Sequence, residues 1–219
     1  MTTDPATPPP RRGARPGPRA RETRRRVEEA AGRLFSEQGY ATTTMQAIAD
    51  EAGVHVQTIY LAYGTKAAVL AAAATRLVAG EDDPDSHPSE RAWAREIQAT
   101  PDPATKLRLY VRHIRDVAPR VVRLVDVLRA NAPGDPDVAA FHAHMEQGRW
   151  AGPHALFAPL ADEGALRSGL PVTTAADATY ALASPDTFRA LVERRGWSWD
   201  QAETWIADRL VETLLGNGQ

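Results

Sequence analysis

A glycine that interrupts an amphipathic helix is the feature that most constrains how this chain can fold. The apolar residues before it follow the i, i+3, i+4, i+7 spacing of a helix buried along one face: Met45, Ile48, Ala49 and Ala52. Gly53 then breaks the pattern, and the chain resumes at once with VHVQTIY. Because glycine readily adopts the left-handed conformation that ends helices, the sequence predicts two short helices joined by a tight turn.

Further helices are expected on both sides of this pair. A first helix runs from residue 21 to about Gly39, with one apolar face made by Val27, Ala30, Ala31, Leu34 and Phe35. Thr43 and Gln46 have the spacing of a capping box for the second helix, although Thr44 is an equally good N-cap. The third helix covers about 55–62, and Thr65 caps a fourth.

Two short helices joined by a glycine turn and steadied by a helix behind them form a helix-turn-helix. Val54, Ile59 and Tyr63 can hold the second helix of the pair on the core. The residues left to face outward, where a DNA major groove could receive them, are Val56, Gln57, Thr58 and Leu61. Gln57 suits adenine, Thr58 suits several base edges, and the two apolar residues suit thymine methyl groups. Spacing alone leaves open an ordinary helical corner in which Gln57 and Thr58 are simply solvated.

The segment RRRVEEAAGRLFSEQGYATTTMQAIADEAGVHVQTIYLAYGTKAAVL resembles the N-terminal domain of the TetR family of bacterial transcriptional regulators over about residues 21–77. The specific elements are LFSEQGY, TTTMQAIADEAGV, QTIY and YGTK. The resemblance implies a homodimer that binds a palindromic operator in double-stranded DNA. Two positions depart from the usual pattern: His55 stands where serine is common, and Ala67 follows the lysine of the fourth helix.

The candidate DNA contacts fall into two groups. Residues placed against bases are Gln46, Val56, Gln57, Thr58 and Leu61. Residues placed against phosphates are Thr44, His55, Tyr60 and Lys66, because helix N-termini attract anions and a lysine adds positive charge.

Charge is unevenly distributed along the chain. Residues 1–20 carry four arginines and one aspartate, whereas residues 80–219 carry fifteen basic and twenty-one acidic side chains. The first twenty residues are also rich in proline, which predicts a disordered arm. Its arginines could follow the DNA backbone or minor groove, the alternative being a solvated leader: Arg11, Arg12, Arg15 and Arg19.

The remainder of the chain is expected to be helical, which makes the fold all-α. Helices are predicted at about 89–98, 103–131 with Pro119 as a candidate kink, 135–163, 173–194 with a bend or break at Pro185, and 198–215. The predicted organisation is an arm at 1–20, a helix-turn-helix DNA-binding domain at 21–79, and a helical effector-binding and dimerisation domain at 80–219.

The resemblance also implies a C-terminal helical domain that binds a small-molecule effector, and the core of a helix bundle, among the central helices, is a normal place for its pocket. The candidate pocket residues are Trp93, Tyr110, His113, Phe141, His142, Trp150 and Phe157. The last two helices form the dimer surface that the resemblance implies, with Tyr180, Leu191, Trp205, Leu210 and Leu214 as candidate contacts. No metal site is expected, because only His142 and Glu146 share a helix face and no third ligand accompanies them. No cofactor is expected either.

The resulting hypothesis is a cytoplasmic transcriptional regulator that a small molecule releases from its operator; repression is the sign that the resemblance favours, with activation as the alternative. The chain has no cysteine, no long apolar segment for a membrane span and no apolar leader. Two other classes remain as alternatives. One is a helix-turn-helix adaptor that binds a protein, and the other is a helical enzyme, against which stands the lack of any nucleophile elbow or HExxH motif.

Overall fold

The computed structural model describes residues 17–80 and 84–216, and in these ranges every element longer than an isolated bridge is helical. The predicted all-α class is therefore confirmed. The N-terminal helices are α1 (Pro18–Gln38), α2 (Met45–Ala52), α3 (Val56–Tyr63) and α4 (Lys66–Ala79). They are followed by α5 (Ala92–Ala99), α6 (Pro103–Asn131), α7 (Pro136–Asp162), α8 (Val172–Leu182), α9 (Pro185–Arg189) and α10 (Trp199–Leu214). No helix of the described part is long and apolar enough to cross a membrane.

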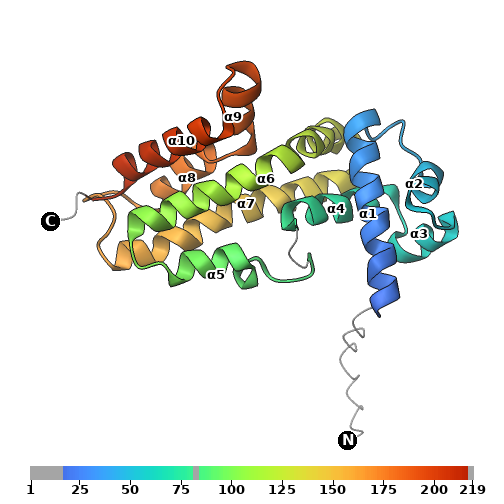
Figure 1. Cartoon of the computed structure of the whole chain (residues 1–219), viewed down its shortest axis with the longest axis horizontal. Coiled ribbons are helices and arrows are strands. Elements are labelled where there is room, and N and C mark those ends of the chain that lie inside the picture. Colours follow the sequence, from blue (N-terminus) through green and yellow to red (C-terminus); the bar gives the residue numbers. More distant parts are fainter. Residues whose placement is uncertain (1–16, 81–83, 217–219) are drawn as a thin grey trace, which may run out of the picture.

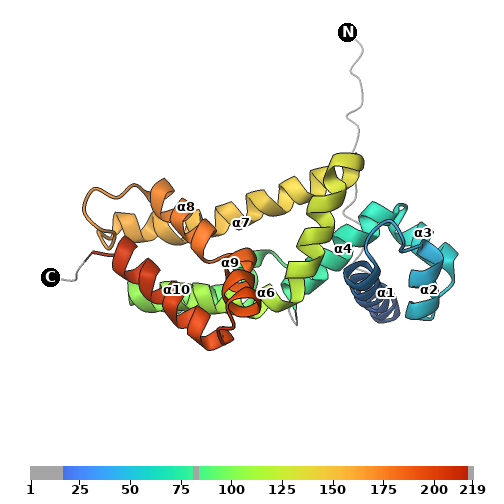
Figure 2. The same cartoon turned by 90° about the horizontal axis from the view of Figure 1, so that it is seen from above.

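The molecule is elongated, with α1, α2 and α3 at one end and α5, α8 and α10 toward the other (Figure 1). Helix α4 leads from the N-terminal group toward α6 and α7, with which it packs. Figure 2 shows α6 and α7 as two long helices, with α10 beside α6 and α8 beside α7. The short α9 packs on α6.

The apolar core is divided between the two ends. One cluster joins α1 to α4 around Phe35, Ile48 and Leu70, all of them fully buried. A second cluster joins α5 to α10 around Phe157, Phe188 and Ile206. The ends of α6 and α7 contribute to the first cluster, so these long helices bury apolar surface in both regions: the residues concerned are Leu124, Leu128 and Val138. A movement of α6 or α7 would therefore displace residues that pack in the N-terminal cluster.

At the N-terminal end one predicted boundary is wrong, and the structure decides between the two N-cap candidates of the second helix. Helix α1 begins at Pro18 rather than at residue 21, so the last residues of the predicted arm are helical. A proline at the first helical position costs no hydrogen bond, and the alanine and arginines after it are good helix formers. The N-cap of α2 is Thr44, whose hydroxyl accepts the Ala47 N–H at 3.0 Å, whereas Thr43 is buried and donates to the Gly39 carbonyl at 2.8 Å. The capping box of Thr43 and Gln46 therefore does not form.

Two prolines of the C-terminal part, Pro119 and Pro185, were predicted to kink or break helices, and both lie where the helical direction changes. The second half of α6 turns away from the first half in Figure 2, and Pro119 is the proline inside this helix. The predicted helix over 173–194 is broken before Pro185, which begins α9 with Ser184 as its N-cap. The segment Ala190–Arg194 that follows is a wider helical turn of the π type.

Candidate nucleic-acid interface

The turn between α2 and α3 has the conformation that the glycine predicts. Gly53 has φ 64° and ψ 45°, in the left-handed region, and its N–H bonds the Ala49 and Asp50 carbonyls. The next N–H, that of Val54, donates to the Ala49 carbonyl at 3.0 Å. These bonds satisfy the carbonyls left free at the end of α2, so the direction in which α3 leaves the turn is fixed.

Helix α3 is held on the core by one side and presents the other to solvent. Ile59 is fully buried, and Val54 and Tyr63 pack partly buried against the same cluster. Gln57 and Thr58 are exposed, and Leu61 is 88% exposed. Val56 was expected to face outward with them, but it is half-buried against the N-terminal core because it lies one turn from Ile59.

The candidate contacts outside α3 lie on neighbouring surfaces. Thr44 and His55 are the exposed N-cap residues of α2 and α3. Gln46 is exposed in the first turn of α2, where its amide donates to the Asp50 carboxylate at 2.7 Å. Tyr60 is 49% exposed on α3. The two helix N-termini add their partial positive charge to this face.

Lys66 is held by the protein itself at the start of α4. Its ammonium donates to the Tyr40 carbonyl at 2.7 Å and to the Thr43 carbonyl at 3.1 Å, and it lies 4.3 Å from the centre of the Tyr40 ring. An ammonium has three donors, so one N–H remains for a phosphate. The positive charge is thereby fixed next to the N-terminus of α2, whichever partner takes the third donor.

A buried carboxylate that sequence reasoning missed ties α1, α3 and α4 together. Glu28 is 5% exposed and accepts the Arg76 Nε–H at 2.9 Å and the Tyr63 hydroxyl at 3.1 Å. Burial of the tyrosine, followed by the nearby carboxylate, raises the pKa of Tyr63 to about 12. The signal was present in the sequence, since Glu28 is spaced i, i+3, i+7 with the buried Ala31 and Phe35. The network positions the helix that carries Gln57 and Thr58.

Most of the proposed arm lies outside the described residues: this applies to Arg11, Arg12 and Arg15. Arg19 is exposed on the first turn of α1. Arg25 and Arg26, further along the same helix, are also exposed. The beginning of α1 therefore adds positive charge to the N-terminal end of the molecule.

Comparison with known proteins agrees with this geometry. The family model described as "Bacterial regulatory proteins, tetR family" matches residues 29–73, which span most of α1 through α4. The N-terminal part of the chain, at residues 29–73, is therefore similar to the DNA-binding region of the TetR family. No curated relative matches its sequence significantly.

Solved structures resemble this chain over most of its length. A protein from Saccharomonospora viridis, described as a transcriptional regulator and solved with choline, has a TM-score of 0.70 at 18% identity and covers 90% of this chain and 100% of its own. FadR from Bacillus subtilis, solved with stearoyl-CoA, has a TM-score of 0.69 at 17% identity, covering 85% and 97%. A TetR transcription regulator from Haloarcula marismortui has a TM-score of 0.64 at 19% identity, covering 90% and 100%. At these identities the likeness establishes a shared fold.

The C-terminal part of the chain contains a cavity of about 400 Å³ between α5, α6 and α7. Trp93 and Tyr110 line it, as the sequence predicted. His113 does not line it but stacks on Trp93, with ring centres 3.8 Å apart. Burial, together with the nearby positive charge of Arg120, lowers the pKa of His113 to about 4. This imidazole is therefore neutral near neutral pH.

The other predicted pocket residues are elsewhere, which corrects that part of the prediction. Phe157 is fully buried in the C-terminal core, and Phe141 packs against the N-terminal cluster. Trp150 is 41% exposed and donates to Asp177 on α8 at 2.8 Å. His142 does not line the cavity. Sequence reasoning also missed the small residues of α7 that make the wall: Gly148, Ala151, Gly152 and Ala155.

Some of the residues predicted at the dimer interface are buried inside the protomer, and others are exposed. Leu210 and Leu214 are fully buried in the core of the protomer, so they are wrongly assigned to an interface. Leu191 is half-buried against that core. Trp205 is 40% exposed on α10, with its ring at 90° to that of Trp197.

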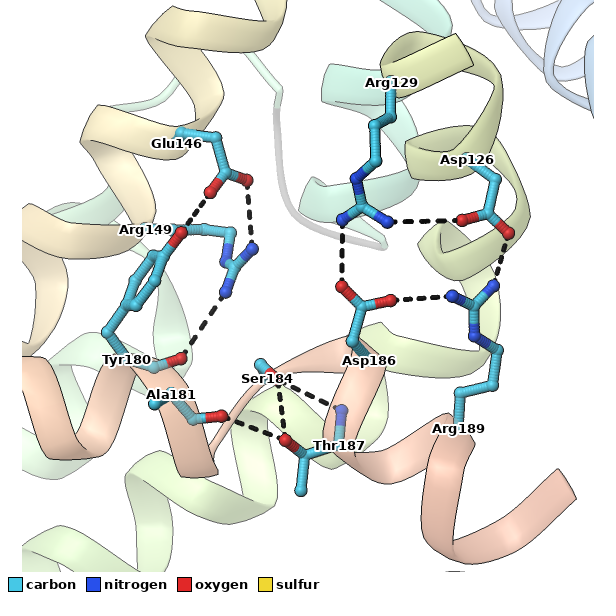
Figure 3. Close-up of polar contacts among 10 residues, drawn as sticks. All are labelled: Asp126, Arg129, Glu146, Arg149, Tyr180, Ala181, Ser184, Asp186, Thr187 and Arg189. Carbon is cyan, nitrogen blue, oxygen red and sulfur yellow. Dashed lines mark hydrogen bonds and ion pairs between the residues drawn. The ribbon is translucent and has the colours of Figure 1, made fainter. Parts of the chain in front are cut away.

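Polar contacts fix the α8–α9 corner to the long helices (Figure 3). Tyr180 of α8 donates its hydroxyl to Glu146 of α7, and Arg149 lies over the tyrosine ring at 4.5 Å from its centre. On the other side of the corner, two ion pairs join α6 to α9: Arg129 pairs with Asp186, and Asp126 pairs with Arg189. Tyr180 is thus partly engaged within the protomer and presents only some of its surface outward.

Proposed function

We propose that this chain is a sequence-specific transcriptional regulator that binds palindromic DNA as a homodimer and is released by a small molecule. The observation that carries the proposal is the division of α3 into two sides. Ile59 anchors the helix, while Gln57, Thr58 and Leu61 are free to meet base edges. A helix of eight residues standing at one end of the molecule has the form that enters a major groove.

In a homodimer, the second protomer supplies a second α3 helix to contact the same DNA duplex. Two α3 helices must lie about 34–36 Å apart to enter successive major grooves on one face of a duplex. The exposed Trp205 of α10 and the neighbouring Trp197 lie in a groove whose other lining residues are polar, and the two rings offer the apolar part of a surface for a partner subunit. Residues 80–219 would then serve as the dimerisation and effector-binding part, and residues 21–79 as the DNA-binding part.

Release is explained by the packing of α4. This helix contacts α1 on one side and α6 and α7 on the other, and the cavity lies against α6 and α7. A ligand that favours one arrangement of α6 and α7 would shift α4 and change the distance between the two α3 helices. The structures with choline and with stearoyl-CoA support a ligand site in such a chain. Repression with release by the effector is the expected sign.

The experiment is a titration of DNA from upstream of the chain's own gene, at several salt concentrations, with wild type and two variants. We expect Gln57→Ala to lose discrimination at one base pair per half-site, a change of about 1–3 kcal/mol. We expect Tyr60→Phe to weaken binding to all sequences equally, because a phosphate contact carries no sequence information. Wild-type protein that binds no DNA at low salt, where backbone contacts are strongest, would refute the proposal.

A further inference from the structure

We infer that the cavity between α5, α6 and α7 is built for an amphipathic anion, a molecule with a carboxylate or similar group on an apolar body. The inference rests on the proposed function in taking this cavity as the effector site, and it adds the chemical class of the ligand. The fold does not decide this class, because the similar structures named above hold a cation in one case and an acyl-CoA in the other.

The wall of the cavity is mainly apolar. Trp93 and Ile97 contribute from α5, Leu156 from α7, and the ring of Tyr110 from α6. The small residues of α7 leave room beside them, and a methyl group added at Gly152 would lie 3.4 Å from the Tyr110 hydroxyl oxygen. An apolar ligand body in this space would be stabilised by removal of its surface from water.

Among the residues that the structure describes, Lys106 is the only one lining the cavity with a fixed charge, and none of the described carboxylates lines it. Its side chain is half-buried on α6, and no hydrogen bond or ion pair joins it to another residue in the described part of the chain. Partial burial of an unpaired ammonium is unfavourable, and an anionic group beside it would offset that cost. Gln98, which also lines the cavity, can add a donor through its amide.

The surroundings of the cavity oppose a cationic ligand. One face of the Trp93 ring is already covered by the neutral His113, so the tryptophan offers less of its surface to a cation. Arg120 and the buried Arg91 both act electrostatically on His113, against one acidic neighbour, Asp116, so the charges near this ring are mostly positive, although none of the three residues lines the cavity.

The positions of the polar groups give the ligand a direction. Lys106 and Tyr110 are one turn apart on the same face of α6, about 6 Å along the axis. The anionic group would lie at Lys106, near the start of α6, and the apolar body would extend past Tyr110 toward Trp93 and the glycines of α7.

The test compares three ligands of equal chain length, octanoate, octan-1-ol and octylamine, by calorimetric titration into the full chain. We expect octanoate to bind roughly tenfold more tightly than the alcohol, and the amine to bind most weakly. Lys106→Met should bring the acid and the alcohol to within about twofold of each other, whereas Lys106→Arg keeps the preference. Arg112→Met is the control, because it removes a cation from the same helix at a residue that does not line the cavity.

The outcomes separate this inference from the proposed function. Equal binding of acid and alcohol, a preference that survives in Lys106→Met, or no binding of any of the three would each overturn the inference. If DNA is still bound normally in those cases, the proposed regulator stands without it. Binding of octanoate that depends on Lys106 in a protein that never binds DNA would support the ligand class and refute the regulator.

Discussion

The energetic role of a single charged residue in this protein depends on its burial, as two ion pairs of equal length illustrate. Arg76 and Glu28 are 2.9 Å apart with side chains 20% and 6% exposed, and Arg33 and Glu51 are also 2.9 Å apart but 53% and 47% exposed. Arg76→Met leaves a buried carboxylate with one partner fewer, so we expect a loss of about 3 kcal/mol in the free energy of unfolding. Arg33→Met should cost less than about 1 kcal/mol.

Urea denaturation of both variants measures these losses. The double variant Glu28→Leu with Arg76→Met should recover part of the stability, because it removes the stranded charge together with its partner. Equal losses in the two single variants would show that the buried network does not hold α1 and α4 together.

Because of His113, we expect the free energy of unfolding to decrease as the pH falls. Burial lowers its pKa to about 4, from 6.5 in the unfolded chain. As the pH falls below about 6.5, the unfolded chain takes up the proton first, so stability declines until about pH 4. Between about pH 7 and about pH 5 this amounts to a loss of about 2 kcal/mol.

His113→Phe keeps a ring against Trp93 but cannot be protonated. Denaturation at the two pH values should show a smaller loss for this variant than for wild type, by about the same 2 kcal/mol. Identical pH profiles would mean that His113 is protonated in the folded protein without penalty.

At the scale of the elements, the turn before α3 depends on a backbone conformation rather than on space. A methyl group at Gly53 would meet only Arg26 Nη1, at 3.6 Å, but φ is 64°. We expect Gly53→Ala to destabilise the protein by roughly 1 kcal/mol and to weaken DNA binding, because α3 would leave the turn at a changed angle. Gly134→Ala, at a glycine without positive φ and with nothing within 4 Å, is the control for thermal unfolding and DNA titration.

Local patterns predicted most of the helices, and they failed where two local solutions compete. Thr43 and Thr44 both have the chemistry of an N-cap, and burial of Thr43 under α1 decides between them. Pro18 can end a disordered arm or begin a helix, and the helix-forming alanine and arginines that follow it favour the second. Pro185 was readable as a break because it cannot donate a hydrogen bond to the preceding turn, but the same loss leaves α6 continuous at Pro119 and α7 continuous at Pro153 and Pro159.

At the scale of the whole molecule, the candidate DNA-binding surface could be predicted from the sequence, whereas the cavity could not. The exposed side of α3 was predictable because two short helices and a glycine fix it locally. The cavity was not, since it depends on which faces of α5, α6 and α7 meet. Bulky residues such as Phe157 and Trp150 were assigned to it, yet one fills the core and the other faces solvent. Glycines and alanines, which carry no chemical signal, make the wall instead.

The assembly of two chains is the last level, and it can be tested with two tryptophans of equal exposure. Trp205 is 40% exposed on α10, and Trp150 is 41% exposed on α7. If the α10 face joins the subunits, Trp205→Glu buries a charge in the interface and should yield monomers by light scattering. Operator binding should fall by far more than binding to a single half-site, because each monomer carries one α3. Trp150→Glu should leave the dimer intact; monomers from this variant alone would place the interface on α7 instead.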